Sequence, residues 1–286
     1  MNRIEKFVAY VRLPHYSQRW NLYFLTDFHF GSKACDVELL KADVARIAED
    51  DFAYVFMGGD SFEAIAPDDI RYEMDLHNWS KDYSKNIVRD LAVILDPIKK
   101  KILAGITGNH EDKFEKRHYA DLSDMLYDRL EVPYLGYSAI FPIKVQVPFT
   151  REKNRVGESK DGWETKYTLD FFGHHGAGGG RLPGSKINRL VQAQLGFDAD
   201  IYFMGHVHDT SGYVSSKIGC RDSGGMYDKT KAFVVGATYY KSYMQGSTTY
   251  AEKMMFNPSR LGCTKLSIAM VPGGTRWAMP NVVMEL

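Results

Sequence analysis

Five apolar segments of the chain each run into glycine and a cluster of polar side chains, and this recurring arrangement constrains the fold most. In the clearest case, the apolar and aromatic residues 52–57 lead into Gly58, Gly59 and Asp60. A short apolar run that turn residues end is typical of a buried strand. Open α/β sheets bind their ligands beyond the carboxyl ends of such strands, so Asp60 is predicted to lie at a binding site.

Four more apolar segments, at 20–26, 101–107, 165–172 and 201–204, end in the same way. Their clusters are Asp27 and His29; Asn109, His110 and Glu111; His174 and His175; and His206 and His208. Six of the nine histidines lie in these clusters, although strand interiors alone give no reason for histidine at four separate ends. Imidazole and carboxylate together suit zinc, manganese, iron or nickel. The sequence therefore predicts a divalent metal site.

The spacing within the clusters indicates which side chains can reach one ion. In an extended segment, residues i and i+2 face the same side, so both members of the D-x-H and H-x-H clusters are expected to point to one ion region. A carboxylate has two oxygens and can bridge two cations. Neighbours in an extended chain face opposite sides, so only one of the adjacent His174 and His175 is expected to be a ligand.

The order of predicted elements indicates an α/β (α+β) fold with two packed sheets and outer helices. Segments 20–26 and 52–57 flank a predicted helix at 36–51, a spacing typical of a parallel strand–helix–strand unit. An edge strand at 4–13, a loop at 61–80, a helix at 82–100 bent or ended by Pro97, a strand at 101–107 and a charged helix at 112–130 complete the first half. The second half is expected to have strands at 134–147, 165–172, 201–204, 213–217, 232–240, 263–271 and 278–284, a helix at 182–195, and a hairpin tip or mobile loop at 151–164. We expect a single domain over residues 1–286.

The balance of charge argues against some partners. Lys and Arg number 36, as do Asp and Glu, whereas generic binders of nucleic acid or anionic membranes usually carry a basic excess. The cysteines, Cys35, Cys220 and Cys263, are too few and too scattered for a disulfide framework. Because the N-terminal segment lacks a long apolar region and no apolar run reaches the length of a membrane span, we expect a soluble cytoplasmic protein without a membrane partner.

Taken in order, the five clusters resemble the motifs of the calcineurin-like metallophosphoesterase superfamily, over residues 27–208. The resemblance implies a four-layer αββα sandwich of two mixed sheets flanked by helices, and a site for two divalent metal ions. It also favours His175 over His174 as the ligand, because the family's residue is usually followed by glycine, as Gly176 follows here.

The resemblance implies a role for each matching residue. The first ion would bind Asp27, His29 and His208, the second Asn109, His175 and His206, and Asp60 would bridge the two. His110 would lie near the scissile phosphate and either protonate the leaving oxygen or stabilise charge, and Glu111 would orient His110. We further expect Gly58 and Gly59 to leave room for the bridged pair of ions, because a side chain at either position would crowd the approach.

The implied activity is hydrolysis of a phosphomonoester or phosphodiester by metal-activated hydroxide, with the diester slightly favoured. Manganese is favoured over iron, zinc and nickel as the metal. Nucleotides and nucleic acids are among the candidate substrates, and no phosphate-binding P-loop pattern is present. The alternatives are a DNA or RNA nuclease of the same superfamily and a non-catalytic scaffold. The sequence leaves the oligomeric state open.

Three residues are candidate substrate contacts: His174, Arg181 and Lys186. The glycine-rich turn around Arg181 and Lys186 follows a candidate ligand directly, and backbone amides with a helix N-terminus can hold phosphate. The alternatives are a flexible loop with solvated basic residues, and a packing or supporting role for His174.

Overall fold

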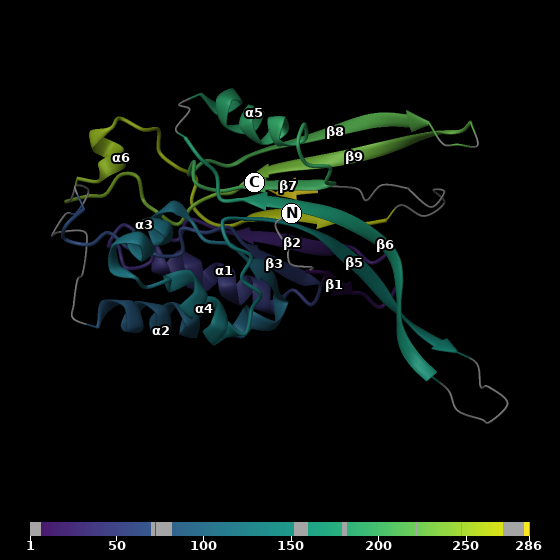
Figure 1. Ribbon diagram of the computed structural model, residues 1–286, viewed down its shortest axis with the longest axis horizontal. Coiled ribbons are helices and arrows are strands. Elements are labelled where there is room, and N and C mark those ends of the chain that lie inside the picture. Colours follow the sequence, from purple (N-terminus) through teal and green to yellow (C-terminus); the bar gives the residue numbers. More distant parts are fainter. Residues whose placement is uncertain are drawn as a thin grey trace.

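Two β-sheets packed face to face form the centre of the molecule, and helices cover their outer faces (Figure 1). The computed structural model describes residues 7–69, 72, 82–151, 160–178, 182–220, 222, 224–246, 248–270 and 283–285. Both sheets mix parallel and antiparallel pairs. The α/β class and the sandwich of two mixed sheets between helices, which were predicted from the sequence, are therefore confirmed.

The five-stranded sheet has the order β11-β10-β2-β3-β4. Its strands are β2 Trp20–Leu25, β3 Ala53–Met57, β4 Ile102–Gly105, β10 Thr264–Ile268 and β11 Val283–Glu285. Strands β2 and β3 are parallel and are joined by helix α1, Val37–Glu49, so the predicted strand–helix–strand unit is confirmed. Asp36, the first residue of the helix predicted at 36–51, caps the N-terminus of α1, since its side chain accepts a hydrogen bond from the Leu39 amide.

The six-stranded sheet has the order β1-β5-β6-β7-β9-β8. Its strands are β1 Ala9–Arg12, β5 Ser138–Arg151, β6 Lys160–His174, β7 Ile201–Met204, β8 Ser211–Cys220 and β9 Met226–Val235. Helix α5, Pro183–Ala193, covers its outer face. The hairpin of β5 and β6 is longer than predicted: Arg151 and residues 160–164 of the expected loop at 151–164 are strand, and residues 152–159 lie outside the described part.

The alternating side chains of the strands divide the core into layers. Phe24 and Phe56 face the space between the sheets, where the ring of Phe24 stacks on Phe203 with 4.7 Å between centroids. Their neighbours Leu25 and Met57 face the other side of the sheet, against the helices. This alternation with a period of two residues explains why the strands read as continuous apolar runs: both of their faces are buried.

Helices α2, Tyr83–Leu95, and α4, Leu122–Leu130, lie with α1 against the five-stranded sheet (Figure 1). Pro97 does end α2, because a 3-10 helix, Asp96–Lys101, begins just before it. A short helix that was not predicted, α6 Tyr250–Lys253, lies between the predicted strands at 232–240 and 263–271. Of the predicted strand at 278–284 only the part within β11 is described. Among the described residues, no helix has both the length and the apolar composition needed to cross a bilayer.

The predicted helix at 112–130 is wrong in two respects. It is divided into α3, Asn109–His118, and α4, because Tyr119 adopts a left-handed conformation with φ 55° and Asp121 begins a new helix by accepting from the Asp124 amide. In addition, α3 begins three residues earlier than expected. The Asn-His-Glu cluster therefore occupies the first turn of a helix rather than an extended strand end.

Candidate metal centre

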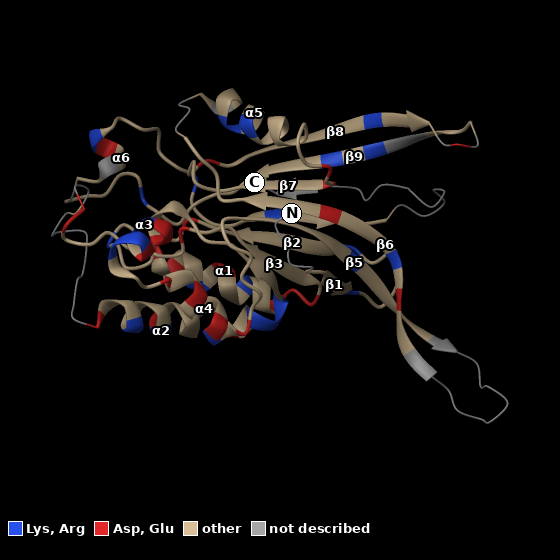
Figure 2. Cartoon of the chain, in the orientation of Figure 1, with Lys and Arg blue, Asp and Glu red and all other residues tan. Residues whose placement is uncertain are grey.

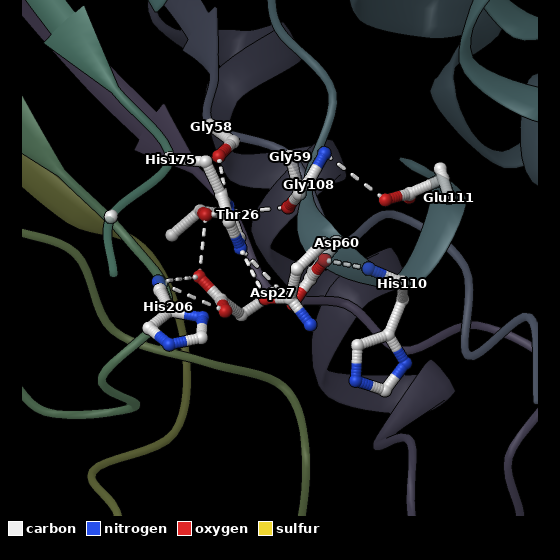
Figure 3. Close-up of polar contacts among 12 residues, drawn as sticks. Thr26, Asp27, Gly58, Gly59, Asp60, Gly108, His110, Glu111, His175 and His206 are labelled. Carbon is white, nitrogen blue, oxygen red and sulfur yellow. Dashed lines mark hydrogen bonds and ion pairs between the residues drawn. The ribbon is translucent and has the colours of Figure 1, made fainter. Parts of the chain in front are cut away.

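The segments that follow the parallel strands of both sheets meet at one end of the sandwich (Figure 3). They carry Asp27 and His29 after β2, Asp60 after β3, Asn109 and His110 at the start of α3, His175 after β6, and His206 and His208 after β7. Residues that are 179 positions apart thus come together, as His29 and His208 do with 2.9 Å between their Nε2 atoms. The site lies where an open α/β sheet binds ligands.

The backbone at this site is not extended, which corrects the reason given for the D-x-H and H-x-H spacing. Five residues have a positive φ: Asp27 52°, His29 50°, Asp60 47°, His206 70° and His208 48°. Such left-handed conformations are unusual outside glycine and concentrate at functional sites. The turns are held by hydrogen bonds between segments, among them Asp27 N to the Gly59 carbonyl, 2.9 Å, and His29 N to the Asp60 carbonyl, 3.1 Å.

A first group of ligand atoms consists of Asp27, His29 and His208. Asp27 Oδ1 lies 3.2 Å from His208 Nε2, and His208 Nε2 lies 2.9 Å from His29 Nε2. The other ring nitrogen of His29, Nδ1, lies 2.7 Å from Glu63 Oε2. Burial opposes the charged form of His29, but the charge of Glu63 and this hydrogen bond raise the pKa of His29 to about 9.

A second group consists of Asp60, His175 and His206, with Asn109 beside it. His175 is fully buried, and its Nδ1 lies 2.8 Å from the Gly58 carbonyl oxygen, to which it must donate. Its Nε2 then carries a lone pair, yet faces two further acceptors, Asp60 Oδ2 at 3.1 Å and Asn109 Oδ1 at 3.2 Å. The ring of His206 lies 5.3 Å from that of His175.

This donor set fits a cation. Acceptor atoms that face one another in a buried site are stable only when a positive charge lies between them. In the ion-free protein a proton takes that place: burial opposes it, but the charge of Asp60 raises the pKa of His175 to about 10. Oxygen and imidazole nitrogen donors in this mixture suit a borderline divalent metal.

Asp60 belongs to the second group and also approaches the first. Its Oδ2 is 3.1 Å from His175 Nε2 and 4.0 Å from His29 Nε2, and its Oδ1 accepts from the His110 amide at 3.0 Å (Figure 3). Burial disfavours its charge, yet the neighbouring His175 and His110 hold the pKa of Asp60 well below its usual range. A buried, ionised carboxylate in contact with both groups is suited to serve two ions.

The contacts of His110 and Glu111 differ from the expectation that Glu111 orients His110. The carboxylate of Glu111 accepts from the backbone amides of Phe62, at 2.9 Å, and Gly108, at 3.1 Å. Burial, followed by the charge of Asp60, raises its pKa to about 7. The ring of His110 instead places Nδ1 2.6 Å from the backbone oxygen of Glu63. Glu111 thus holds the backbone at Phe62 and Gly108, and the Glu63 carbonyl orients the ring of His110.

Glu63 is a residue of the site that the sequence reasoning missed. Its side chain is almost completely buried. Its carboxylate contacts His29 Nδ1, and its backbone carbonyl contacts His110 Nδ1. The signal was present: a single carboxylate stands in the otherwise apolar run Phe62–Ala66, three positions after Asp60. Carboxylates buried in such surroundings need a partner, which here is imidazole.

The predicted substrate contacts lie at the edge of the site. His174 is half-buried, and its Nδ1 accepts from the Gly176 amide at 2.8 Å, so it stands apart from both ligand groups. Lys186 donates to Asp209 at 3.0 Å, next to His208. Arg181 lies outside the described residues.

Gly58 and Gly59 are required by packing within the protein and not, as expected, by the space that two ions need. A Cβ atom at Gly58 would lie 2.6 Å from Phe203 and Thr26 side chains, and one at Gly59 would lie 2.6 Å from the Thr107 carbonyl. Both contacts lie in the packed core rather than at the ligand atoms. The glycine that leaves room for the Asp60 carboxylate is Gly108, where a Cβ would collide with that carboxylate and its amide.

Comparison with known proteins assigns the chain to a family. A family model described as calcineurin-like phosphoesterase matches residues 21–210. Among solved structures, a conserved uncharacterized protein from Streptococcus pneumoniae, described as a predicted phosphoesterase, is 12% identical with a TM-score of 0.35, over 94% of this chain and 99% of that one. Vps29 from Chaetomium thermophilum is 9% identical with a TM-score of 0.31, over 93% and 94% of the two chains. A search of curated proteins found no match. Because the family model spans well over half of the sequence, the chain belongs to the calcineurin-like phosphoesterase family.

Proposed function

We propose that the protein is a binuclear metal-dependent hydrolase of phosphate esters, with diesters slightly favoured over monoesters. The observation that carries this proposal is the pair of ligand groups linked by Asp60, whose Oδ2 lies 4.0 Å from His29 Nε2 in the first group and 3.1 Å from His175 Nε2 in the second. A family of phosphoesterases supplies the reaction class. A single domain over residues 1–286 remains part of the proposal, supported by the apolar layer that both sheets share.

One divalent ion would be held by Asp27, His29 and His208. The other would be held by Asn109, His175 and His206, and Asp60 would bind both ions. Ions bound there supply an acidified water and positive charge for the phosphoryl oxygens. The chain prepares this site by fixing two rings: the Gly58 carbonyl holds His175, and the Glu63 carboxylate holds His29, each with Nε2 turned towards Asp60. Neither of these two rings has to reorient when an ion arrives.

His110 is proposed to act on the leaving group. Its Nδ1–H stays on the Glu63 carbonyl, so the other ring nitrogen is the one that can deliver a proton to the departing oxygen. The Glu63 carboxylate, 3.9 Å from Nδ1, stabilises the imidazolium form that this role requires. The bond from the His110 amide to Asp60 ties this residue to the proposed bridge.

The finer features of the proposal are the metal, the substrate and the location in the cell. We propose manganese as the metal, a nucleotide or other phosphate ester as substrate, and a cytoplasmic location. Basic and acidic residues are interspersed on α2, α3 and α4 in Figure 2, which favours a small ester over a long nucleic acid. His174, Arg181 and Lys186 are proposed substrate contacts, and Lys186 would then exchange its bond to Asp209 for one to substrate.

The proposal is tested with manganese-loaded protein and two chromogenic esters, p-nitrophenyl phosphate and bis-p-nitrophenyl phosphate. We expect two metal equivalents by elemental analysis and turnover that is faster for the diester. Faster turnover of the monoester would reverse the preference, and cleavage of single-stranded DNA or RNA in preference to both would identify a nuclease. Two bound metals without any turnover would identify a scaffold.

A further inference from the structure

Tyr137 lies on the turn between α4 and β5, and two segments of the candidate metal centre hold its backbone in place. The carbonyl of the preceding Gly136 accepts from the Thr107 amide at 2.8 Å, two residues before Asn109. The carbonyl of Tyr137 itself accepts from the His175 amide at 3.3 Å. The turn is therefore attached to two of the segments that deliver ligand atoms to the second group, those of Asn109 and His175.

The ring of Tyr137 contacts the two adjacent histidines. It lies 5.7 Å from the ring of His175 at an interplanar angle of 89°, and 5.4 Å from the ring of His174 at 70°. These edge-to-face contacts are favourable for aromatic rings and need no hydroxyl group. A phenylalanine would make them equally well, so packing does not explain why the residue is tyrosine.

The hydroxyl of Tyr137 makes only a weak hydrogen bond within the described part of the chain. Its described hydrogen bond, to the Gly176 carbonyl, is 3.5 Å long, at the outer limit for such a bond. Gly176 in turn lies directly against His206, because a Cβ there would be 2.8 Å from the His206 Cβ. The hydroxyl thus lies where the chain leaves His175 and passes His206, on a side chain that is only half-buried.

We propose that Tyr137 is a substrate-binding residue whose hydroxyl donates a hydrogen bond to a non-bridging oxygen of a phosphoryl group held beside His175 and His206. This inference rests on the proposed function, since it places the phosphoryl group at the candidate metal centre. A phenol keeps its proton at neutral pH and so remains a donor. A hydrogen bond to a charged oxygen contributes a factor of about 10 to 100 in affinity.

The test compares Tyr137→Phe with wild-type protein, both loaded with manganese. Inorganic phosphate is the probe, and its dissociation constant is measured by calorimetry alongside metal content and ester turnover. Tyr10→Phe is the matched control, because Tyr10 lies on the exposed face of the edge strand β1. We expect Tyr137→Phe to keep both metals and to weaken phosphate binding about 10- to 100-fold, with kcat/KM reduced in parallel. The control should match wild type.

The outcomes separate this inference from the proposed function. Unchanged phosphate affinity in Tyr137→Phe, or no phosphate binding by wild type, overturns the role of Tyr137. Loss of metal from Tyr137→Phe also overturns it, because the residue would then only position His175. If wild type binds phosphate and Tyr137→Phe binds it less well, but neither hydrolyses an ester, the role of Tyr137 stands and the proposed hydrolase activity fails.

Discussion

Glu63 offers the sharpest test of how the site is built, because it contacts Nδ1 of His29, the ring nitrogen that is not the candidate metal ligand. Its Oε2 lies 2.7 Å from His29 Nδ1, and both side chains are about 95% buried, at 5% and 4% exposure. A carboxylate in this position fixes the orientation of the ring and makes Nε2 a better donor to metal. Losing such a partner costs about 10- to 100-fold in metal affinity.

Two substitutions separate orientation from charge. Glu63→Gln keeps an oxygen that can accept from Nδ1–H but loses the charge, so we expect the affinity for the first ion to fall about 10-fold. Glu63→Ala loses both contacts, and we expect a fall nearer 100-fold. The Glu63 backbone carbonyl that holds His110 is present in both variants.

The assay is calorimetric titration of chelator-treated protein with manganese. Glu38→Gln is a suitable control, because that carboxylate is 83% exposed and, within the described part of the chain, pairs with Lys41 on the surface of α1. The second ion should bind with nearly unchanged affinity in all variants. Wild-type affinity for both ions in Glu63→Gln and Glu63→Ala would refute the reasoning, as would an equal loss in the Glu38→Gln control.

Four further predictions address the rest of the site. Asp60→Ala should lower the content of both metals, whereas Asp27→Ala should mainly lower that of one; a full equivalent retained in Asp60→Ala, by elemental analysis, would contradict the bridge. His110→Ala should keep both metals and lose about 10²- to 10⁴-fold in turnover, and a loss of metal would contradict its role on the leaving group. Gly108→Ala should destabilise the protein by about 1–3 kcal/mol, because its Cβ would collide with the Asp60 carboxylate; an unchanged melting temperature would count against this. Finally, metal binding at pH 7 should release protons, because the raised pKa of His175, about 10, means that the ion-free ring is charged. Proton release, measured by calorimetry in buffers of different ionisation enthalpy, should vanish above about pH 10. By the same linkage, the charged ring stabilises the ion-free fold fully below its unfolded pKa of about 6.5, and that stability is lost as the pH rises through about 10.

Local pattern was sufficient for much of the fold. The strands β2 and β3 could be located because both faces of each are apolar, and their parallel pairing followed from the length of the connection that contains α1. The boundaries were less predictable where apolar periodicity continues across a break. Tyr119 divides α3 from α4 through a single left-handed residue, which a run of charged and apolar side chains does not reveal.

The site shows the same division. Glycine beside Asp60, Asn109 and the clustered histidines marks the ends of segments, and the chemistry of these side chains is independent of the fold, so the sequence by itself determined which residues are candidates. Which of two neighbours turns inwards depends on packing between distant strands: His175 faces Asp60, and His174 faces Tyr137.

The contacts that orient the candidate ligands were decided only by the tertiary structure. Glu63 reaches His29 across 34 positions, and the Gly58 carbonyl reaches His175 across 117. Neither contact leaves a periodic trace in the chain, because a hydrogen bond between segments needs only one suitable atom at one place. The left-handed backbone at Asp27 and Asp60 was likewise decided only by the tertiary structure. Such conformations are unfavourable locally and persist because bonds from neighbouring segments hold them, so only the folded whole can select them.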